Sequence, residues 1–344
     1  MREFMRTVSI LAALAPLAAA QANIVNAKLD TRAATAGLER EYRAIAEAAA
    51  APAWIGYSVP AIEGDHRECC WNGDSRCGCF LESEHATKVS SGHAEKLEAS
   101  GRVAVLIRVA DRKVSRIRVY SENCELDAGG LAVHWLTDVR PAESVALLAT
   151  FVTGGDRLSD SAIMAISMHD DQAADRALNE FVTPARPEAI REKTSFWLGA
   201  ARGKRGYDVL RRLVRDDPSN ELRAKAVFAL SINKTPEAVD SMIDAAKNDK
   251  SAHVRSQALF WLAQKSGEKA AAAITDAILS DPETEVKKQA VFSLSQLPKD
   301  RGVPLLIQFA RTNRNPEVRK QAMFWLGQSQ DARALAFFEE VLKH

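Results

Sequence analysis

The residues with the clearest chemical potential are five cysteines, all in the first 124 positions of this 344-residue chain: Cys69, Cys70, Cys77, Cys79 and Cys124. Thiolates act as nucleophiles and metal ligands, and thiols in an oxidising compartment pair as disulfides. The segment 67–80 is polar and poor in helix and strand formers, which is typical of a stretch held by crosslinks. We therefore predict disulfides, with one thiol of the odd count left free or intermolecular.

A metal site is the main alternative for these cysteines. The four that precede position 80 supply four thiolates, with His66 and His85 nearby, and tetrahedral Zn²⁺ accepts such ligands. Structural zinc sites usually use Cys-x2-Cys pairs, which bend the backbone around the metal, whereas these pairs are adjacent or one residue apart. Disulfides are favoured, with unpaired thiols as a third state, and no resident metal or cofactor is predicted.

Nucleophilic catalysis is a further alternative, because Cys124, Asp127 and His134 lie close together in sequence. Nothing in the sequence places the imidazole beside the thiol, and Gly129-Gly130 indicates a tight turn. The sequence also lacks the motifs of serine hydrolases, zinc proteases and phosphate-binding loops. We predict no catalytic residue, and an enzyme or metal-binding protein with its site in this N-terminal region is the alternative function.

Residues 1–22 have the pattern of a cleavable signal peptide. Arg2 and Arg6 precede the apolar run 9–20, and Ala20 and Ala22 are the small residues that a signal peptidase reads. The run is shorter than the roughly 20 residues that a membrane span requires, although an uncleaved anchor is the alternative. We predict cleavage after Ala22, a periplasmic or secreted location, and no membrane insertion of the mature form.

Charge and composition exclude some classes of partner. Lys and Arg total 46 against 45 Asp and Glu, a net charge of +1. This balance predicts neither nucleic-acid binding nor attraction to an anionic membrane. Apolar residues make up 47% of the chain, enough for a core, and the length favours two structural units.

The first unit is predicted to be a small cysteine-containing α+β domain over residues 23–140, which caps the second unit. An Ala- and Glu-rich segment indicates a helix, and alternating apolar segments bounded by turns indicate strands. They are a helix over 30–51, a strand over 54–60, a hairpin of 103–109 with 113–120, and a strand over 131–139.

The second unit, residues 141–344, repeats every 32 residues. Phenylalanine occurs at 196, 228, 260, 292 and 324, leucine two positions after each, and alanine at 226, 258, 290 and 322. Aliphatic, Ala and Leu residues at i, i+4 and i+8 lie on one helical face, and a second apolar helix precedes each of these. We predict six two-helix repeats and a final helix over 332–342, with Leu335, Phe338 and Leu342 facing inward and Phe337 or Val341 partly exposed.

The turns inside the repeats carry a second period. Asp217, Asp249, Asp281 and Asn313 each precede a basic residue by six positions: Arg223, Arg255, Lys287 and Arg319. The acidic or amide side chain can cap the following helix, and the basic residue can bond it or its equivalent in the next repeat.

The segments VRSQALFWLAQ, VKKQAVFSLSQLP and VRKQAMFWLGQSQD resemble short bacterial HEAT repeats, and the Asp and Arg positions match that family's pair. The resemblance covers residues 142–344 and implies a mostly α, right-handed α-solenoid. Some HEAT-like proteins are bilin lyases or hydroxylases, but this sequence shows no active-site motif for either activity. What the resemblance implies for function is a binding scaffold.

Aromatic residues give the most suggestive surface pattern. Trp197, Trp261 and Trp325 recur every 64 residues, each directly after the repeat phenylalanine. One interpretation is that both aromatic rows pack between layers; the other is that Phe196, Phe228, Phe260, Phe292 and Phe324 line an inner groove as a ligand platform. The predicted function is a non-enzymatic scaffold that holds a protein or peptide in this groove; the residues give no oligomeric state.

Overall fold

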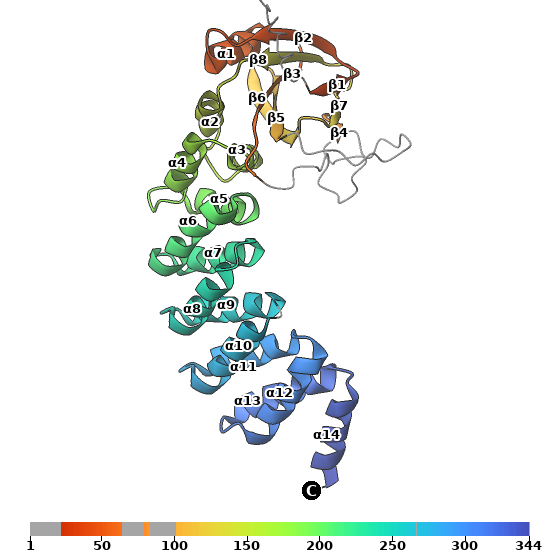
Figure 1. Cartoon of the computed structure of the whole chain (residues 1–344), viewed down its shortest axis with the longest axis vertical. Helices are drawn as coiled ribbons and strands as arrows, with labels where there is room; N and C mark the ends of the chain where they lie inside the picture. The colour runs from red at the N-terminus through yellow and green to blue at the C-terminus, as the bar shows by residue number, and fades with distance from the viewer. Residues whose placement is uncertain (1–21, 64–78, 83–100, 266, 344) are drawn as a thin grey trace, which may run out of the picture.

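The computed structural model describes residues 22–63, 79–82, 101–265 and 267–343. A sheet unit at the N-terminal end is followed by a long stack of helices (Figure 1). The predicted signal peptide up to Gln21 and the cysteine positions 69, 70 and 77 lie outside the described residues.

The sheet unit contains two sheets. The strands are β1 (Asn23–Val25), β2 (Lys28–Ala33), β3 (Ala53–Pro60), β4 (Cys79–Phe80), β5 (Arg102–Ala110), β6 (Lys113–Ser121), β7 (Glu125–Asp127) and β8 (Ala132–Thr137). The larger sheet has the order β2-β8-β3-β5-β6, in which β2, β8 and β3 are parallel and β3, β5 and β6 are antiparallel. The smaller, parallel sheet has the order β1-β7-β4.

Strand β5 reads as a continuous apolar run because both of its faces are buried. Val105 and Ile107 belong to the core cluster that extends into the helical stack, whereas Leu106 packs on the other face with Trp135 and the smaller sheet. The predicted strand over 54–60 and the predicted hairpin are confirmed by β3, β5 and β6.

The helix predicted over residues 30–51 is wrong in its first part. Lys28–Ala33 is strand β2, paired in parallel with β8, and the helix α1 spans only Leu38–Ala48. Gly37, at φ 94°, lies directly before the helix in a conformation that favours glycine. The Ala-rich composition indicated a helix, but pairing with a distant strand decided the first four residues of that segment, 30–33.

The stack consists of helix pairs. Its first helices, here called A helices, are α2 (Pro141–Ala149), α4 (Gln172–Phe181), α6 (Gly203–Asp216), α8 (Ala238–Asn248), α10 (Glu268–Ser280) and α12 (Lys299–Thr312). Their partners, the B helices, are α3 (Arg157–Ser167), α5 (Glu188–Ala201), α7 (Asn220–Ile232), α9 (Ala252–Lys265), α11 (Thr284–Ser295) and α13 (Pro316–Gln328). A final helix, α14 (Ala332–Lys343), follows. The α-solenoid with a small N-terminal sheet region is confirmed.

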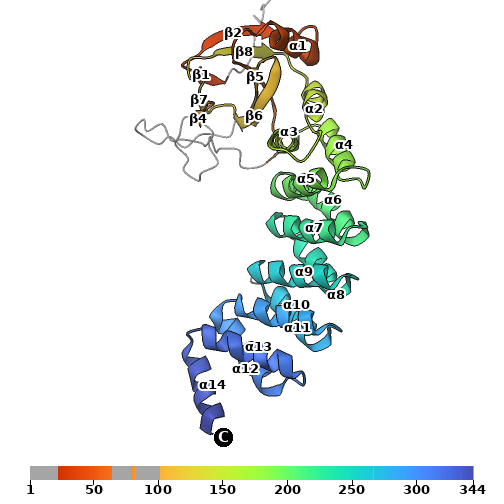
Figure 2. The same cartoon turned by 180° about the vertical axis from the view of Figure 1, so that it is seen from behind.

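The repeat rows form one apolar core along the stack. The aliphatic, Ala and Leu rows of the B helices are buried in every repeat from α7 onward, as in Val254, Ala258 and Leu262. Successive B helices pack against one another more extensively than successive A helices do. The row of B helices therefore forms the inner, concave face, on the side where the sheet unit and α14 lie (Figures 1 and 2).

The face predicted for the last helix is wrong. Phe337 and Ala334 are buried, whereas Leu335 and Leu342 are exposed and Phe338 is half-buried. Helix α14 turns away from the stack instead of continuing the A-helix row, so the 32-residue register no longer decides which face is covered (Figure 1). Within the described residues, no helix combines the length and apolar composition needed to cross a bilayer.

Candidate functional site

The predicted aromatic residues lie on the B helices, and the structure joins them into one continuous series of ring contacts, the aromatic ladder. Its order is Trp197, Phe196, Phe228, Trp261, Phe260, Phe292, Trp325 and Phe324. Within each B helix the phenylalanine lies on the face opposite the buried Ala and Leu positions. The ladder therefore runs along the concave face.

The ladder has a period of two repeats. Phe196 stacks on Phe228 and Phe260 on Phe292, with centroids 6.2 and 6.1 Å apart. Trp261 then links one stacked pair to the next, because its ring centre lies 4.6 Å from that of Phe228 and 4.9 Å from that of Phe260. A tryptophan is needed in alternate repeats only, and the intervening positions are the buried small residues Ala229 and Ser293.

The solvent exposure of the rings bears on both interpretations of the Phe and Trp rows. Trp197 is buried and its indole donates a hydrogen bond to Asp160, 3.1 Å away. Phe228, Phe260 and Phe292 are half-buried, and Phe324 is 54% exposed. The rings therefore pack against each other and still present apolar surface to solvent, and their role as a ligand platform stays a prediction.

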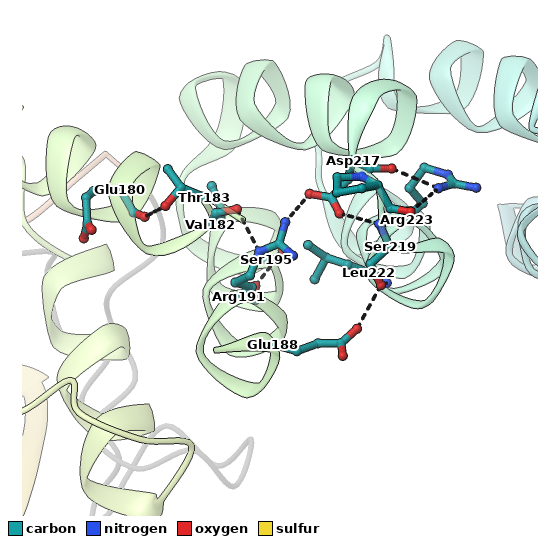
Figure 3. Close-up of polar contacts among 11 residues, drawn as sticks. Glu180, Val182, Thr183, Glu188, Arg191, Ser195, Asp217, Ser219, Leu222 and Arg223 are labelled. Carbon is teal, nitrogen blue, oxygen red and sulfur yellow. Dashed lines mark hydrogen bonds and ion pairs between the residues drawn. The ribbon is translucent and has the colours of Figure 1, made fainter. Parts of the chain in front are cut away.

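The predicted Asp and Arg pairs form a second series, the arginine–aspartate ladder. Arg223 donates two hydrogen bonds to Asp249 of the next repeat, at 2.8 and 2.9 Å, and a third to the backbone carbonyl of Asp217, at 2.9 Å. Arg191 donates one hydrogen bond to Asp217 and another, at 3.0 Å, to the backbone carbonyl of Val182, and Asp217 also accepts the backbone N–H of Ser219 (Figure 3).

This second ladder is buried and weakens toward the C-terminus. Arg223 is only 1% exposed, and Arg255 bonds Asp281 at 2.7 and 3.0 Å. Burial raises the pKa of Asp249, but hydrogen bonds from Arg223 and the backbone outweigh it, and the net shift is downward. Lys287, at the equivalent position of the next repeat, contacts only the carbonyl oxygen of Leu279, at 3.4 Å. The two parallel hydrogen bonds from an arginine to an aspartate are therefore not repeated there.

Sequence reasoning missed a buried polar network between the sheet unit and the first repeats. Ser144 Oγ lies 2.8 Å from Tyr57 Oη and 2.8 Å from His169 Nε2, and His169 Nδ1 lies 2.7 Å from the carbonyl oxygen of Ala165. Burial lowers the pKa of His169 to about 4. The carbonyl can only accept, so in the neutral imidazole Nδ1 donates and Nε2 accepts from Ser144.

This network resembles a serine–histidine pair but is placed for structure. Ser144 and His169 are fully buried, and Arg202 adds bonds to the backbone carbonyls of Ser167 and His169. The network ties β3 to α2 and the end of α3. Its two hydrogen-bonded side-chain pairs are 87 and 25 positions apart, so no local sequence signal could have revealed it.

The N-terminal candidates are not assembled into a reactive site within the described residues. His134 Nδ1 lies 3.1 Å from Asp30 Oδ2, and Asp127 accepts from Asn26 and the backbone of Gly129. Cys124 is fully buried in the cluster between the two sheets. The contacts that are described therefore place His134 with a carboxylate on a neighbouring strand and leave it apart from the thiol.

The cysteine predictions are only partly accessible to the structure. Cys79 and Cys124 are both buried and disulfide-bonded, whereas Cys69, Cys70, Cys77, His66 and His85 lie outside the described residues. In the described ranges, no three His, Cys, Asp or Glu side chains gather as a metal site would require. The full connectivity stays a prediction.

A cavity of about 620 Å³ between α1 and α2 is lined by small and apolar residues and by five charged side chains. Arg43 donates to Glu39 at 2.6 Å, and Arg140 pairs with Glu143 on the neighbouring helix. Two of the carboxylates that line the cavity, Glu39 and Glu143, are therefore each paired with an arginine.

The model of the family described as HEAT repeats matches residues 178–263 and 271–344. This chain carries a HEAT-repeat domain. The matched ranges include all eight rings of the aromatic ladder and the whole arginine–aspartate ladder. No curated protein matches the chain in sequence.

Three solved structures are similar to parts of this chain. The CpcE–CpcF complex of phycocyanin lyase from Nostoc sp. PCC7120 is 24% identical, covering 45% of this chain and 99% of that one, with a TM-score of 0.34. Human deoxyhypusine hydroxylase in complex with glycerol is 14% identical over 58% and 90%, with a TM-score of 0.28. YibA of Escherichia coli is 16% identical over 58% and 76%, with a TM-score of 0.36. These values assign no activity to this chain.

Proposed function

We propose that this chain is an exported, non-enzymatic scaffold whose HEAT-repeat domain binds a protein or peptide on its concave face. HEAT repeats form helical scaffolds, and such solenoids bind partners on extended concave surfaces. The observation that carries the proposal is the half-exposed aromatic ladder along that face. Aromatic side chains supply large contact areas at low conformational cost and dominate many interfaces.

Partner selection from a peptide library on the full-length protein tests this proposal. Selected peptides should lose binding to a Phe260→Ala/Phe292→Ala variant, which removes one stacked pair from the middle of the ladder. Leu279→Ala is the matched control, because Leu279 is an apolar side chain of the A helix α10 that is 63% exposed. Equal binding to wild type, ring variant and control would place the site elsewhere.

Export and oxidation are the second part of the proposal. The N-terminal segment 1–22 and the cysteine-rich segment suit a protein that matures outside the cytoplasm. N-terminal sequencing of protein recovered from the exported fraction should begin at Asn23. Thiol counting by mass spectrometry, with metal analysis of the same sample, should give two disulfides, one thiol and no zinc; four reduced thiols with one Zn²⁺ would favour the metal alternative.

A further inference from the structure

Strand β2 is an edge of the larger sheet and, within the described residues, is paired on one side only. The sheet has the order β2-β8-β3-β5-β6, and β6, at the opposite edge, packs against α3. β2 is therefore the edge remote from the helical stack, at the end of the molecule opposite α14 (Figures 1 and 2). Its residues are exposed except Ala33, which is half-buried. A strand that approaches this edge does not meet the stack.

The backbone groups of β2 point alternately toward β8 and away from it. The N–H groups of Lys28 and Ala34 donate to carbonyl oxygens at the two ends of β8, at 3.0 and 2.9 Å. Because the direction alternates from one residue to the next, every second residue turns its N–H and C=O outward. These residues are Leu29, Thr31 and Ala33, whose outward groups form no hydrogen bond with any described residue. Such an edge is a template for one more strand.

The side chains on one face of β2 carry charges of alternating sign. Lys28, Asp30 and Arg32 share this face, because successive side chains of a strand point to opposite faces. The side chain of Asp30 is 57% exposed beside His134, at 3.1 Å, and that of Arg32 is 41% exposed beside Glu41, at 3.8 Å. These contacts leave both charged groups accessible to a second molecule.

The charges distinguish the registers in which two copies of β2 can pair antiparallel about a two-fold axis. An exposed strand has no buried face to set the register, so the cross-strand side-chain pairs decide it. With Asp30 on the axis, the two Asp30 carboxylates face each other and Lys28 faces Arg32, which is unfavourable. With Thr31 on the axis, Asp30 of each copy faces Arg32 of the other, and the outward backbone groups of the two strands meet.

The register centred on Thr31 also uses the whole outward edge. Thr31 faces its own counterpart, a favourable cross-strand pair, and Leu29 faces Ala33. A register centred on Leu29 would oppose Lys28 and Asp30, but it would extend to Ala27, which lies outside β2. The pairing about Thr31 therefore combines complementary charges with hydrogen bonds that lie wholly within the strand.

Charged side chains commonly protect an edge strand from pairing, but here their alternation makes the edge complementary to itself in that register. Symmetric dimers that use the same surface on both subunits are the commonest homo-oligomers. We propose that a second copy of this chain pairs with β2, antiparallel about Thr31, and joins the two larger sheets in a weak homodimer. This dimer goes beyond the proposed function and does not depend on it.

Sedimentation equilibrium of the full chain tests the proposal at concentrations up to about 100 µM, because an interface of one strand edge gives weak association. Wild type should show a concentration-dependent equilibrium between monomer and dimer. Thr31→Pro removes an N–H that points away from β8, so the sheet should keep its fold while the dimer is lost. Far-UV circular dichroism checks the fold.

Exchange of the charges at Asp30 and Arg32 is the sharper measurement. Asp30→Arg and Arg32→Asp each place like charges opposite one another twice in the dimer, so each should weaken self-association at least about tenfold. An equimolar mixture of the two variants should form a heterodimer, because every arginine then faces an aspartate. Lys28→Glu is the matched control: Lys28 lies outside the paired residues, and the variant should stay within about twofold of wild type.

Three outcomes would overturn the proposal: a monomer at every concentration, a dimer that a folded Thr31→Pro variant leaves intact, and charge variants that stay monomeric when mixed. If Thr31→Pro does not fold, the mixing experiment decides alone. An effect of Lys28→Glu as large as that of the two charge variants would place Leu29 on the axis and overturn the pairing about Thr31.

Discussion

The phenylalanines of the aromatic ladder and the ion pairs of the arginine–aspartate ladder share a 32-residue period but differ in burial. The arginine–aspartate ladder lies inside the turns, with Arg223 almost completely buried and its guanidinium fully bonded to two repeats. The aromatic ladder lies on the concave face and keeps ring surface in contact with water. Periodicity therefore does not separate structure from function in a solenoid; burial and hydrogen-bond satisfaction do.

The difference follows from the chemistry of each ladder. A buried guanidinium must be paired, because an uncompensated charge in the interior is strongly unfavourable. A half-exposed ring has no such requirement, and a ring-to-ring contact contributes about 0.5–1.5 kcal/mol beyond its area. Changes in the first ladder should act on stability, and changes in the second should act mainly on binding.

The largest effect is expected from Arg223→Ala. The substitution leaves the Asp249 carboxylate and the Asp217 carbonyl without their buried donor. Breaking one side of a buried pair costs about 3–5 kcal/mol, so the free energy of unfolding should fall by that amount. Urea unfolding followed by circular dichroism at 222 nm measures it.

Lys287→Ala is the matched control in the same ladder position. Lys287 is half-buried and makes one long contact with a carbonyl oxygen, so its loss should cost about 0.5 kcal/mol or less. Equal losses for Arg223→Ala and Lys287→Ala would show that the buried pairs do not hold successive repeats together.

The pH dependence of stability should come from the buried polar network of Tyr57, Ser144 and His169. His169 has a pKa of about 4 in the folded protein and about 6.5 when unfolded, so the unfolded state binds more protons between these values. Stability is therefore full above about pH 6.5 and falls as the pH drops toward 4, by up to about 3 kcal/mol. Unfolding free energies between pH 4.5 and 7.5 measure the slope.

A His169→Asn variant tests the assignment, because its side chain does not titrate in this range. It should be less stable than wild type at pH 7 and lose most of the slope between pH 6.5 and 4.5. Asp249 of the arginine–aspartate ladder should contribute little there, because the hydrogen bonds from Arg223 and the backbone outweigh the effect of burial and lower its pKa. A wild-type curve without slope would contradict a buried neutral His169.

A smaller effect is expected in the middle of the aromatic ladder. Phe260→Ala removes one stacked contact and one contact with Trp261, both on the concave surface, and should cost about 1 kcal/mol. Leu262→Ala, two positions away and fully buried, should cost about 2–5 kcal/mol. Equal losses of stability in the two variants would show that the rings are core residues and not a surface available for binding.

The sequence predicted the repeat domain well because each of its rows is a local pattern. Val254, Ala258 and Leu262 are set by helical spacing within one segment, and the next repeat supplies the same neighbours. The prediction of helix instead of strand at residues 30–33 failed because the partner strand β8 lies about a hundred positions away. The prediction for α14 failed because the register ends where the repetition does.

The candidate site was predicted in part for the same reason. Helical spacing placed the phenylalanines away from the core row, but it could not say how far the rings would cover each other. The buried polar network could not be predicted from the sequence, because Tyr57, Ser144 and His169 come together only when the sheet unit packs on the first repeats.

The smallest effect on stability is expected at the C-terminal end of the ladder. Phe324 contacts only Trp325 among the rings and is 54% exposed, whereas Phe292 lies between two aromatic neighbours. Phe324→Ala should therefore cost less than about 0.5 kcal/mol, against about 1 kcal/mol for Phe292→Ala. Both variants should nevertheless weaken peptide binding, because a ring that contributes little to folding still offers its face to a ligand. If Phe324→Ala lost as much stability as Phe292→Ala and left peptide binding unchanged, the aromatic ladder would act on stability, as the arginine–aspartate ladder does, and not on binding.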